Sequence, residues 1–213
     1  DRWWLGGDPI ATAFYNALSI TFPKGEAFFI ERVKAFRDGV PEKLEREIRA
    51  FVQQEVMHTR EHVSFNKRVA DAGYDLTRLE QQVGEALAMT KDRPQILNLC
   101  VTMALEHYTA ILASQFLTDK NAFKGADQEQ IDMWKWHAIE EIEHKGVAYD
   151  TWLHATQGWT RFKRWKVKSL MMLIVSKNFW TKRYQGMLNL LAQDGITGFS
   201  AKARVLWFLL GTP

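Results

Sequence analysis

The sequence predicts an all-α protein, built as a bundle of long helices with a basic helical extension. Through most of residues 1–154, apolar side chains recur at alternating spacings of three and four, which is the period of one helix face. Glycine and proline interrupt this pattern at intervals, where helices end and turns begin. The chain has 213 residues, of which 46% are hydrophobic, so it can bury a sizeable core. We expect the bundle over residues 1–154 and the extension over residues 155–213.

The first two predicted helices contain one glutamate in a core position. A short apolar helix over residues 11–20 ends at a Pro-Lys-Gly turn. An amphipathic helix follows over residues 26–37, with Glu26 in its apolar stripe. Glu31 falls on the polar side of the same helix, where a solvated glutamate is the ordinary case. Glu26 is therefore the first candidate for a buried functional carboxylate.

The third predicted helix carries three polar residues in succession along its apolar stripe. It begins after Pro41 and ends at an Ala-Gly turn. Glu55, His58 and His62 occupy consecutive core positions. A lone histidine there would usually be a packed core residue. Three polar residues in a row need a common partner, because buried charge is costly unless it is paired or binds a metal. A shorter, polar-faced helix over residues 75–92 then joins the two halves.

The second half repeats this arrangement. A long helix that starts at a proline places Glu106 in a core position. One continuous helix is expected over residues 127–154, with His137, Glu141 and His144 on one stripe. Side chains three and four positions apart project from the same side of a helix, so these three converge on a common point.

Together these residues form the ligand set of a ferritin-like bundle with a carboxylate-bridged pair of metal ions. In such bundles, two helices supply a Glu each and two supply a Glu-x-x-His motif each. The chain contains two Glu-x-x-His motifs, and both are in register with an apolar stripe. The alternative is a bundle with buried Glu-His hydrogen bonds and no metal, but four buried carboxylates would repel one another strongly. The predicted ligands are Glu26, Glu55, His58, Glu106, Glu141 and His144, with His62 and His137 as additional donors.

Four segments carry a resemblance to a known family: FPKGEAFF, FVQQEVMHTREHVSFN, ALEHYTA and WHAIEEIEHKGVAYD. They resemble the motifs of a bacterial family described as predicted metal-dependent hydrolases, over residues 18–152. The resemblance implies a ferritin-like di-iron carboxylate site and a dependence on metal. The last segment is also similar to the arylamine N-oxygenases, whose fourth ligand helix has an H-x3-E-x2-H pattern. His137, Glu141 and His144 match that pattern here.

The ligand chemistry favours two iron ions, with manganese or zinc as alternatives. Carboxylates and imidazoles suit iron or manganese, and no thiolate cluster is available for structural zinc. An iron pair would serve oxidation or oxygenation of a hydrophobic small molecule by O2, with an external electron donor. A hydrolase would instead use a metal-bridging water, and Glu140 could act as its general base. A non-catalytic metal-binding bundle is the third possibility.

Glu140 also competes with Glu141 for the role of ligand. His144 lies four positions after Glu140 and three after Glu141, so it can pair with either. Glu141 is the preferred ligand, because its spacing to His144 matches that of Glu55 to His58.

The extension differs from the bundle in charge. From Thr151 onward there are ten Lys or Arg and one acid, whereas residues 1–150 hold 18 basic and 24 acidic side chains. Residues 159–180 combine Lys and Arg with Trp and Phe, which is typical of a helix in a membrane interface. Their uninterrupted apolar stretch, Leu170 to Val175, is too short to span a bilayer. The helix could equally pack on the bundle or form a homodimer contact. No nucleic-acid recognition motif accompanies the charge.

Two further expectations concern the chain end and the compartment. Residues 185–193 and 201–210 are expected to form two short helices that close the fold. One cysteine, Cys100, excludes a disulfide within the chain and fits a reducing compartment. We therefore expect a cytoplasmic protein, with peripheral attachment to the inner face of the membrane as an option through residues 159–180.

Overall fold

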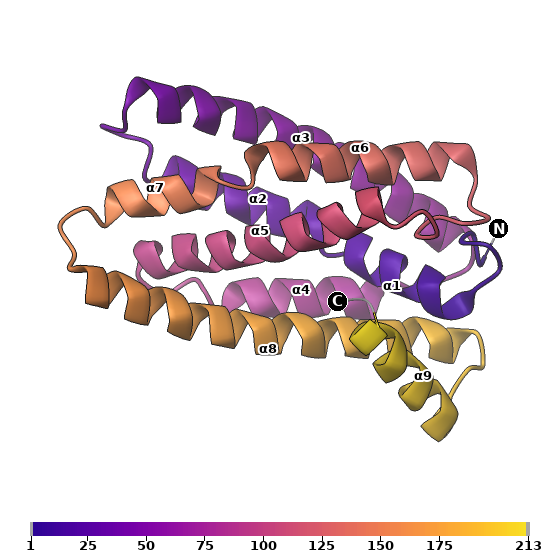
Figure 1. Ribbon diagram of the computed structural model, residues 1–213. Coiled ribbons are helices and arrows are strands. Elements are labelled where there is room, and N and C mark those ends of the chain that lie inside the picture. Colours follow the sequence, from indigo (N-terminus) through magenta and orange to yellow (C-terminus); the bar gives the residue numbers. More distant parts are fainter. Residues whose placement is uncertain (1, 212–213) are drawn as a thin grey trace.

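The computed structural model describes residues 2–211, and over these residues the chain forms α-helices and no strand (Figure 1). The predicted all-α bundle is confirmed. The helices are α1 (Pro9–Ser19), α2 (Phe22–Lys34), α3 (Glu42–Asp71), α4 (Thr77–Ala88), α5 (Gln95–Thr118), α6 (Gln128–His144), α7 (Val147–Ala155), α8 (Arg161–Gln193) and α9 (Gly198–Gly211).

Local chemistry explains where the helices begin and end. The side chain of Asp8 accepts hydrogen bonds from the backbone N–H groups of Ile10 and Ala11 at the start of α1. Pro41 and Pro94 precede α3 and α5, where a missing N–H costs no helical hydrogen bond. After α3, Gly73 adopts a φ of 94°, a left-handed conformation that glycine reaches without strain.

Four helices enclose the centre of the molecule. α2 packs against α3 and α5, and α6 packs against α5 and α3, so that α2, α3, α5 and α6 surround a common interior. α3 and α6 lie side by side along one edge of the bundle in Figure 1. These are the four helices for which the sequence predicts inward carboxylates.

The interior consists of two apolar clusters with a polar layer between them. α3 shows this most clearly, because its Ile48 and Phe51 belong to one cluster and its Phe65 and Val69 to the other. The buried residues between them are polar: Glu55, His58 and His62. The candidate site is therefore enclosed by packed apolar side chains at both ends.

The predicted helix over residues 127–154 is interrupted in the structure. α6 ends at His144, and α7 begins at Val147 after a turn at Lys145 and Gly146. Glycine loses more backbone entropy in a helix than other residues, which favours a break at this position. The apolar stripe persists across the turn, since Ala148 and Thr151 are buried, and so the sequence pattern did not reveal it.

The C-terminal prediction also needs correction. Residues 159–180 and 185–193 were expected in separate helices, but one helix of 33 residues, α8, runs from Arg161 to Gln193. Gly186 lies within it, at a point where any Cβ atom would come within 3.2 Å of the Ala17 Cβ of α1. This glycine permits close packing of α8 on α1 and does not end the helix. The last predicted helix is present as α9.

The extension packs along the bundle. α8 lies against α1 and α5, and α9 lies against α8 and α1 (Figure 1). Its Met187, Leu190 and Leu191 join one apolar cluster, and its Met171 joins the other. The N-terminal half of α8 also leaves large apolar side chains in solvent, among them Phe162 and Leu173, which are 69% and 70% exposed.

α5 alone among the helices of residues 2–211 is long and apolar enough to cross a membrane. Its most apolar window is 56% buried inside the bundle, and a core helix of a soluble protein passes the same test. Its buried Glu106 faces the polar layer, so packing in the bundle accounts for its composition.

Candidate metal centre

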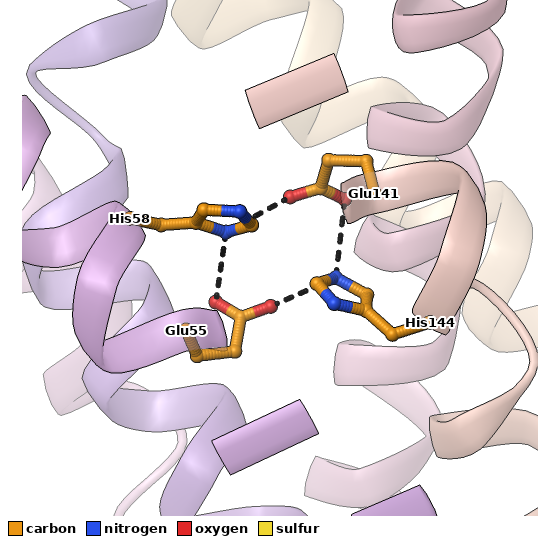
Figure 2. A group of neighbouring side chains, drawn as sticks. All are labelled: Glu55, His58, Glu141 and His144. Carbon is orange, nitrogen blue, oxygen red and sulfur yellow. Dashed lines mark ion pairs between the residues drawn. The ribbon is translucent and has the colours of Figure 1, made fainter. Parts of the chain in front are cut away.

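Two facing helices bring four predicted ligands together at the centre of the bundle. Glu55 and His58 come from α3, and Glu141 and His144 come from α6 (Figure 2). One donor atom from each lies within 4.8 Å of those of the other three, and all four residues are buried. The i, i+3 spacing places each Glu-His pair on the inner side of its helix.

The donor atoms lie close together, but most of them form no hydrogen bond with one another. His144 Nε2 lies 3.2 Å from Glu55 Oε1 and 3.7 Å from Glu141 Oε2, while His58 Nδ1 lies 3.7 Å from Glu141 Oε1. Both oxygens of Glu55 and both ring nitrogens of His58 are buried with no hydrogen-bond partner. Buried polar atoms are almost always paired. Atoms that converge in this way fit a shared metal ion.

The remaining two carboxylates complete the set. Glu106 Oε2 of α5 lies 3.6 Å from His144 Nε2, and both Glu106 oxygens lack a hydrogen-bond partner. Glu26 of α2 accepts a hydrogen bond from Thr59 Oγ1 at 2.7 Å through one oxygen, and its other oxygen is unpaired. The structure thus brings inward carboxylates from all four helices to one buried layer, which is the donor set for two metal ions.

The two additional histidines form a hydrogen-bonded relay. The Ser19 hydroxyl donates to Asn66 Oδ1 at 2.7 Å, so its oxygen accepts from His62 Nδ1 at 2.8 Å. The opposite nitrogen of His62, Nε2, then carries a lone pair and accepts from His137 Nδ1 at 2.9 Å. The remaining ring nitrogen of His137, Nε2, has no hydrogen-bond partner and lies 3.1 Å from Glu141 Oε1.

The relay separates the roles of His62 and His137. Donor atoms of Glu26, His62 and His137 also lie within 4.8 Å of one another, as in a second candidate metal group. Both ring nitrogens of His62 are engaged in hydrogen bonds, however, whereas His137 has one free nitrogen that faces Glu141. His137 therefore keeps a nitrogen available to a metal ion, while the hydrogen bond from His137 to His62 orients the His137 ring.

Loss of the relay is expected to weaken metal binding. Ser19→Ala removes the acceptor that holds His62 in one tautomer, so His137 is no longer held with a lone pair toward the centre. Loss of such a supporting hydrogen bond typically lowers metal affinity by about 10–100-fold. Competition with a chelator measures the affinity, and Ser64→Ala on the exposed side of α3 is the matched control. Equal affinities for the two variants would contradict the relay.

Burial and mutual repulsion set the charges of the metal-free site. Burial raises the pKa values of Glu26, Glu55 and Glu106 well above the ordinary range, and neighbouring carboxylates raise them further. Burial acts on Glu141 in the same direction, but contacts with His137 and His144 outweigh it and hold this pKa well below the ordinary value. A divalent cation would stabilise the charged form of every one of these carboxylates.

The buried histidines are suited to binding a cation. Burial and the nearby His137 lower the pKa of His58 to about 2, and burial lowers the pKa of His62 as well. Both rings are therefore neutral at neutral pH. Burial would also lower the pKa of His144, but Glu141 and Glu106 outweigh it and raise that pKa. A metal ligand must be deprotonated, so an ion would displace any proton that His144 holds.

Residues 1–213 match the sequence profile of a family described as predicted metal-dependent hydrolase. The chain belongs to this family. No curated protein and no solved structure matches it. The family assignment and the buried Glu/His group together identify a metal-dependent protein with a site that fits a di-metal centre.

In this member of the metal-dependent hydrolase family, Glu140 lies at the rim of the site. It is half-buried, and its Oε2 lies 2.9 Å from His58 Nε2, on the opposite side of the ring from Glu55 and Glu141. Burial raises its pKa. The four-residue group contains Glu141 and not Glu140. This geometry favours Glu141 as the ligand and leaves Glu140 as a proton-accepting group beside His58.

Polar residues that the sequence pattern did not single out support the site. Gln54 Oε1 lies 3.0 Å from His144 Nδ1, and its Nε2 donates to Glu143 Oε2 at 3.0 Å. Thr59, Ser19 and Asn66 are the other supporting residues. Their partners lie on other helices, so helical periodicity gave no signal for them.

Proposed function

We propose that this chain binds two iron ions and oxidises a hydrophobic small molecule with O2, using electrons from an external donor. The proposed ligands are Glu26, Glu55, His58, Glu106, His137, Glu141 and His144. The observation that carries the proposal is the layer of buried, unpaired carboxylate and imidazole atoms, which lies beside an apolar cavity of about 230 Å³.

The donor set favours iron over the alternatives. Four carboxylates carry four negative charges, which two divalent ions would neutralise. Carboxylate and imidazole ligands suit iron and manganese, whereas structural zinc sites use thiolates that are absent here, since the single cysteine, Cys100, belongs to an apolar cluster. An iron pair with such ligands supplies O2 activation when bound.

Two residues of the chain would exclude water from the centre and hold a proton beside it. Phe22 of α2 packs its ring 4.4 Å from that of His62 and 4.6 Å from that of His137, and it also lines the cavity. It therefore forms the wall between the histidine relay and the space available to a substrate. Glu140, whose side chain is 19% exposed, can hold a proton at its buried Oε2, which lies 2.9 Å from His58 Nε2.

Metal content and O2 uptake test this function. Protein from iron-supplemented cells should hold about two irons per chain, and its reduced form should consume O2 faster than the free metal does. Glu55→Gln should lose both properties, while Glu47→Gln, a partly exposed glutamate two turns earlier on α3, should keep them. Two bound zinc or manganese ions without O2 uptake would overturn the proposal.

The second candidate is hydrolysis, which the family description favours. Two bound ions would lower the pKa of a bridging water, and Glu140 would act as general base. Turnover of activated esters and phosphoesters by zinc- or manganese-loaded protein tests it. Glu140→Gln should then slow turnover by about 10²-fold or more, and Glu129→Gln, exposed in the first turn of the same helix, is the control. If neither chemistry appears, the chain is a non-catalytic metal-binding bundle.

We also propose that the N-terminal half of α8 contacts an anionic membrane surface. Phe162, Trp165 and Leu173 lie near one side of the helix and are 69%, 59% and 70% exposed. Arg161, Lys163 and Arg164 lie beside them in the sequence. Aromatic side chains at the headgroup level with flanking cations are the composition of an interfacial helix.

Vesicle binding is the expected result. The chain should co-sediment with phosphatidylglycerol vesicles at low salt and much less with phosphatidylcholine vesicles, because cations add attraction only to anionic lipid. A Trp165→Ser/Leu173→Ser double variant should lose binding, while Val63→Ser, 54% exposed on α3, should retain it. Absence of co-sedimentation together with a concentration-dependent dimer that the double variant abolishes would show a homodimer contact instead.

A further inference from the structure

An apolar cavity lies beside the metal centre and is separate from it. It has a volume of about 230 Å³ and is lined by residues of α1, α2, α4, α5 and α8, and none of its lining residues belongs to α3 or α6. Most of its wall is apolar, with Phe28 and Phe29 from α2, Leu105 from α5 and Val175 from α8. Such a wall suits an apolar group.

One charged side chain is buried in this wall. Arg183 of α8 is 4% exposed, and its Nε is buried with no hydrogen-bond partner. Among residues 2–211 its guanidinium forms no ion pair or hydrogen bond, and it lies over the ring of Phe179, 5.3 Å from the centroid. Burial lowers its pKa to about 9, so it remains a cation at neutral pH. A buried cation without a counter-charge is strongly disfavoured.

The cavity provides positive charge and no negative charge. Its wall includes Arg93 and Lys182, both exposed, as well as the buried Arg183, and it includes no Asp or Glu. An anion that entered the cavity would therefore meet cations and no repelling carboxylate. The planar guanidinium binds a carboxylate through two parallel hydrogen bonds, which makes this the best-matched head group.

The cavity also reaches the helices of the metal centre. Gly25, which precedes Glu26, lines it, and so does Thr109, whose hydroxyl donates to the backbone oxygen of Glu106 at 3.0 Å. Phe22 lies between the cavity and the two histidines of the relay. A molecule with its charged head at Arg183 would thus direct its tail along the apolar wall beside the metal ligands.

We propose that this cavity binds a single-chain amphipathic carboxylate, ion-paired to Arg183 and with its apolar tail along α2 and α5. The volume lies below the range of about 300–1,000 Å³ of typical ligand pockets, which favours one short tail over a two-chain lipid. As a binding site it is independent of the metal chemistry. Its role as the substrate pocket rests on the function proposed above.

Titration of the purified full chain with decanoate, under argon so that no turnover occurs, tests the site. Decanoate should bind, and decanol, which has the same tail and no charge, should bind at least about tenfold more weakly. Arg183→Met, which keeps the length of the side chain and removes its charge, should weaken decanoate by a similar factor. It should not lower the melting temperature, because it removes an unpaired buried charge. Lys177→Met, exposed on the same helix and outside the cavity wall, should bind like the parent chain.

A second variant tests whether the apolar tail of the ligand occupies the cavity. Val83→Trp fills the cavity from α4 and leaves Arg183 in place, so it should weaken decanoate and decanol alike. Equal binding of decanoate by the parent chain and Arg183→Met, equal binding of decanoate and decanol, or no binding of either would overturn the proposal. Decanoate binding that depends on Arg183 in a chain without O2 uptake or hydrolysis would overturn the proposed function alone. Metal-dependent activity without decanoate binding would overturn this site alone.

Discussion

Replacing Glu141 with alanine is expected to abolish tight metal binding. Glu141 lies 3.1 Å from His137, and its oxygens lie 3.7 Å from ring nitrogens of both His58 and His144. Burial would raise the pKa of Glu141, but His137 and His144 hold it well below the ordinary value, so this carboxylate already carries charge before metal arrives. Its loss would remove the charged carboxylate that lies next to the imidazoles of His58, His137 and His144.

Glu141→Ala should lower the metal affinity by more than the loss of a supporting residue does, which is about 10–100-fold. Metal analysis after dialysis against a mild chelator measures it. Glu129→Ala, 73% exposed in the first turn of the same helix, is the matched control and should retain the metal. Circular dichroism should show that both variants keep their helices. Full metal retention by a folded Glu141→Ala chain would show that the centre lies elsewhere.

In the metal-free protein, the free energy of unfolding is expected to fall as the pH rises from 7 to 8.5. The unfolded carboxyl groups are ionised throughout this range, whereas the raised pKa values of Glu26, Glu55 and Glu106 favour their protonated form in the folded chain. A group with a raised folded pKa contributes stability at low pH that is lost as the pH rises toward that pKa. The raised pKa of His144 acts in the same direction.

Each carboxyl group can lower the free energy of unfolding by at most about 1.4 kcal/mol per pH unit, so three together set an upper limit of about 4 kcal/mol per unit. His58 and His62 oppose this trend only weakly, because their pKa of about 6.5 in the unfolded chain already leaves them mostly neutral above pH 7. Urea unfolding of metal-free protein at several pH values measures the slope. Metal-loaded protein should show no such decline, since bound cations keep the carboxylates charged. A metal-free chain that gains stability toward pH 8.5 would contradict these charge states.

Helical periodicity explains why the central layer could be predicted from sequence. The stripe of α3 runs from Ile48 through Glu55, His58 and His62 to Val69 without a change of register, so the direction of each side chain followed from its position alone. The same argument placed Glu26 and Glu106 in the interior, and both are buried at 1% exposure. The direction in which a side chain projects from a helix depends on its position in that helix, so the local sequence pattern was sufficient to predict it.

Other features depend on contacts between segments that are distant in sequence. The roles of Ser19 and Gln54 arise from partners on other helices, which spacing within one helix does not reveal. Arg183 follows Lys182 in a basic segment and was not distinguishable from a solvated residue. The 33-residue length of α8 depends on close packing of Gly186 against Ala17, which overrides the helix-breaking tendency of glycine.

The position of the polar layer between two apolar clusters has a consequence for cooperativity. α3 crosses both clusters, and its midpoint consists of ionisable side chains rather than packed hydrocarbon. Bound ions would act there as a cross-link between α3 and α6, so that both ends of the molecule open together. Without bound ions, the polar layer would have lower local stability than the two apolar clusters. Amide hydrogen exchange should then accelerate first at the centre of α3, around Glu55 to His62, which is the reverse of the usual fraying from helix ends.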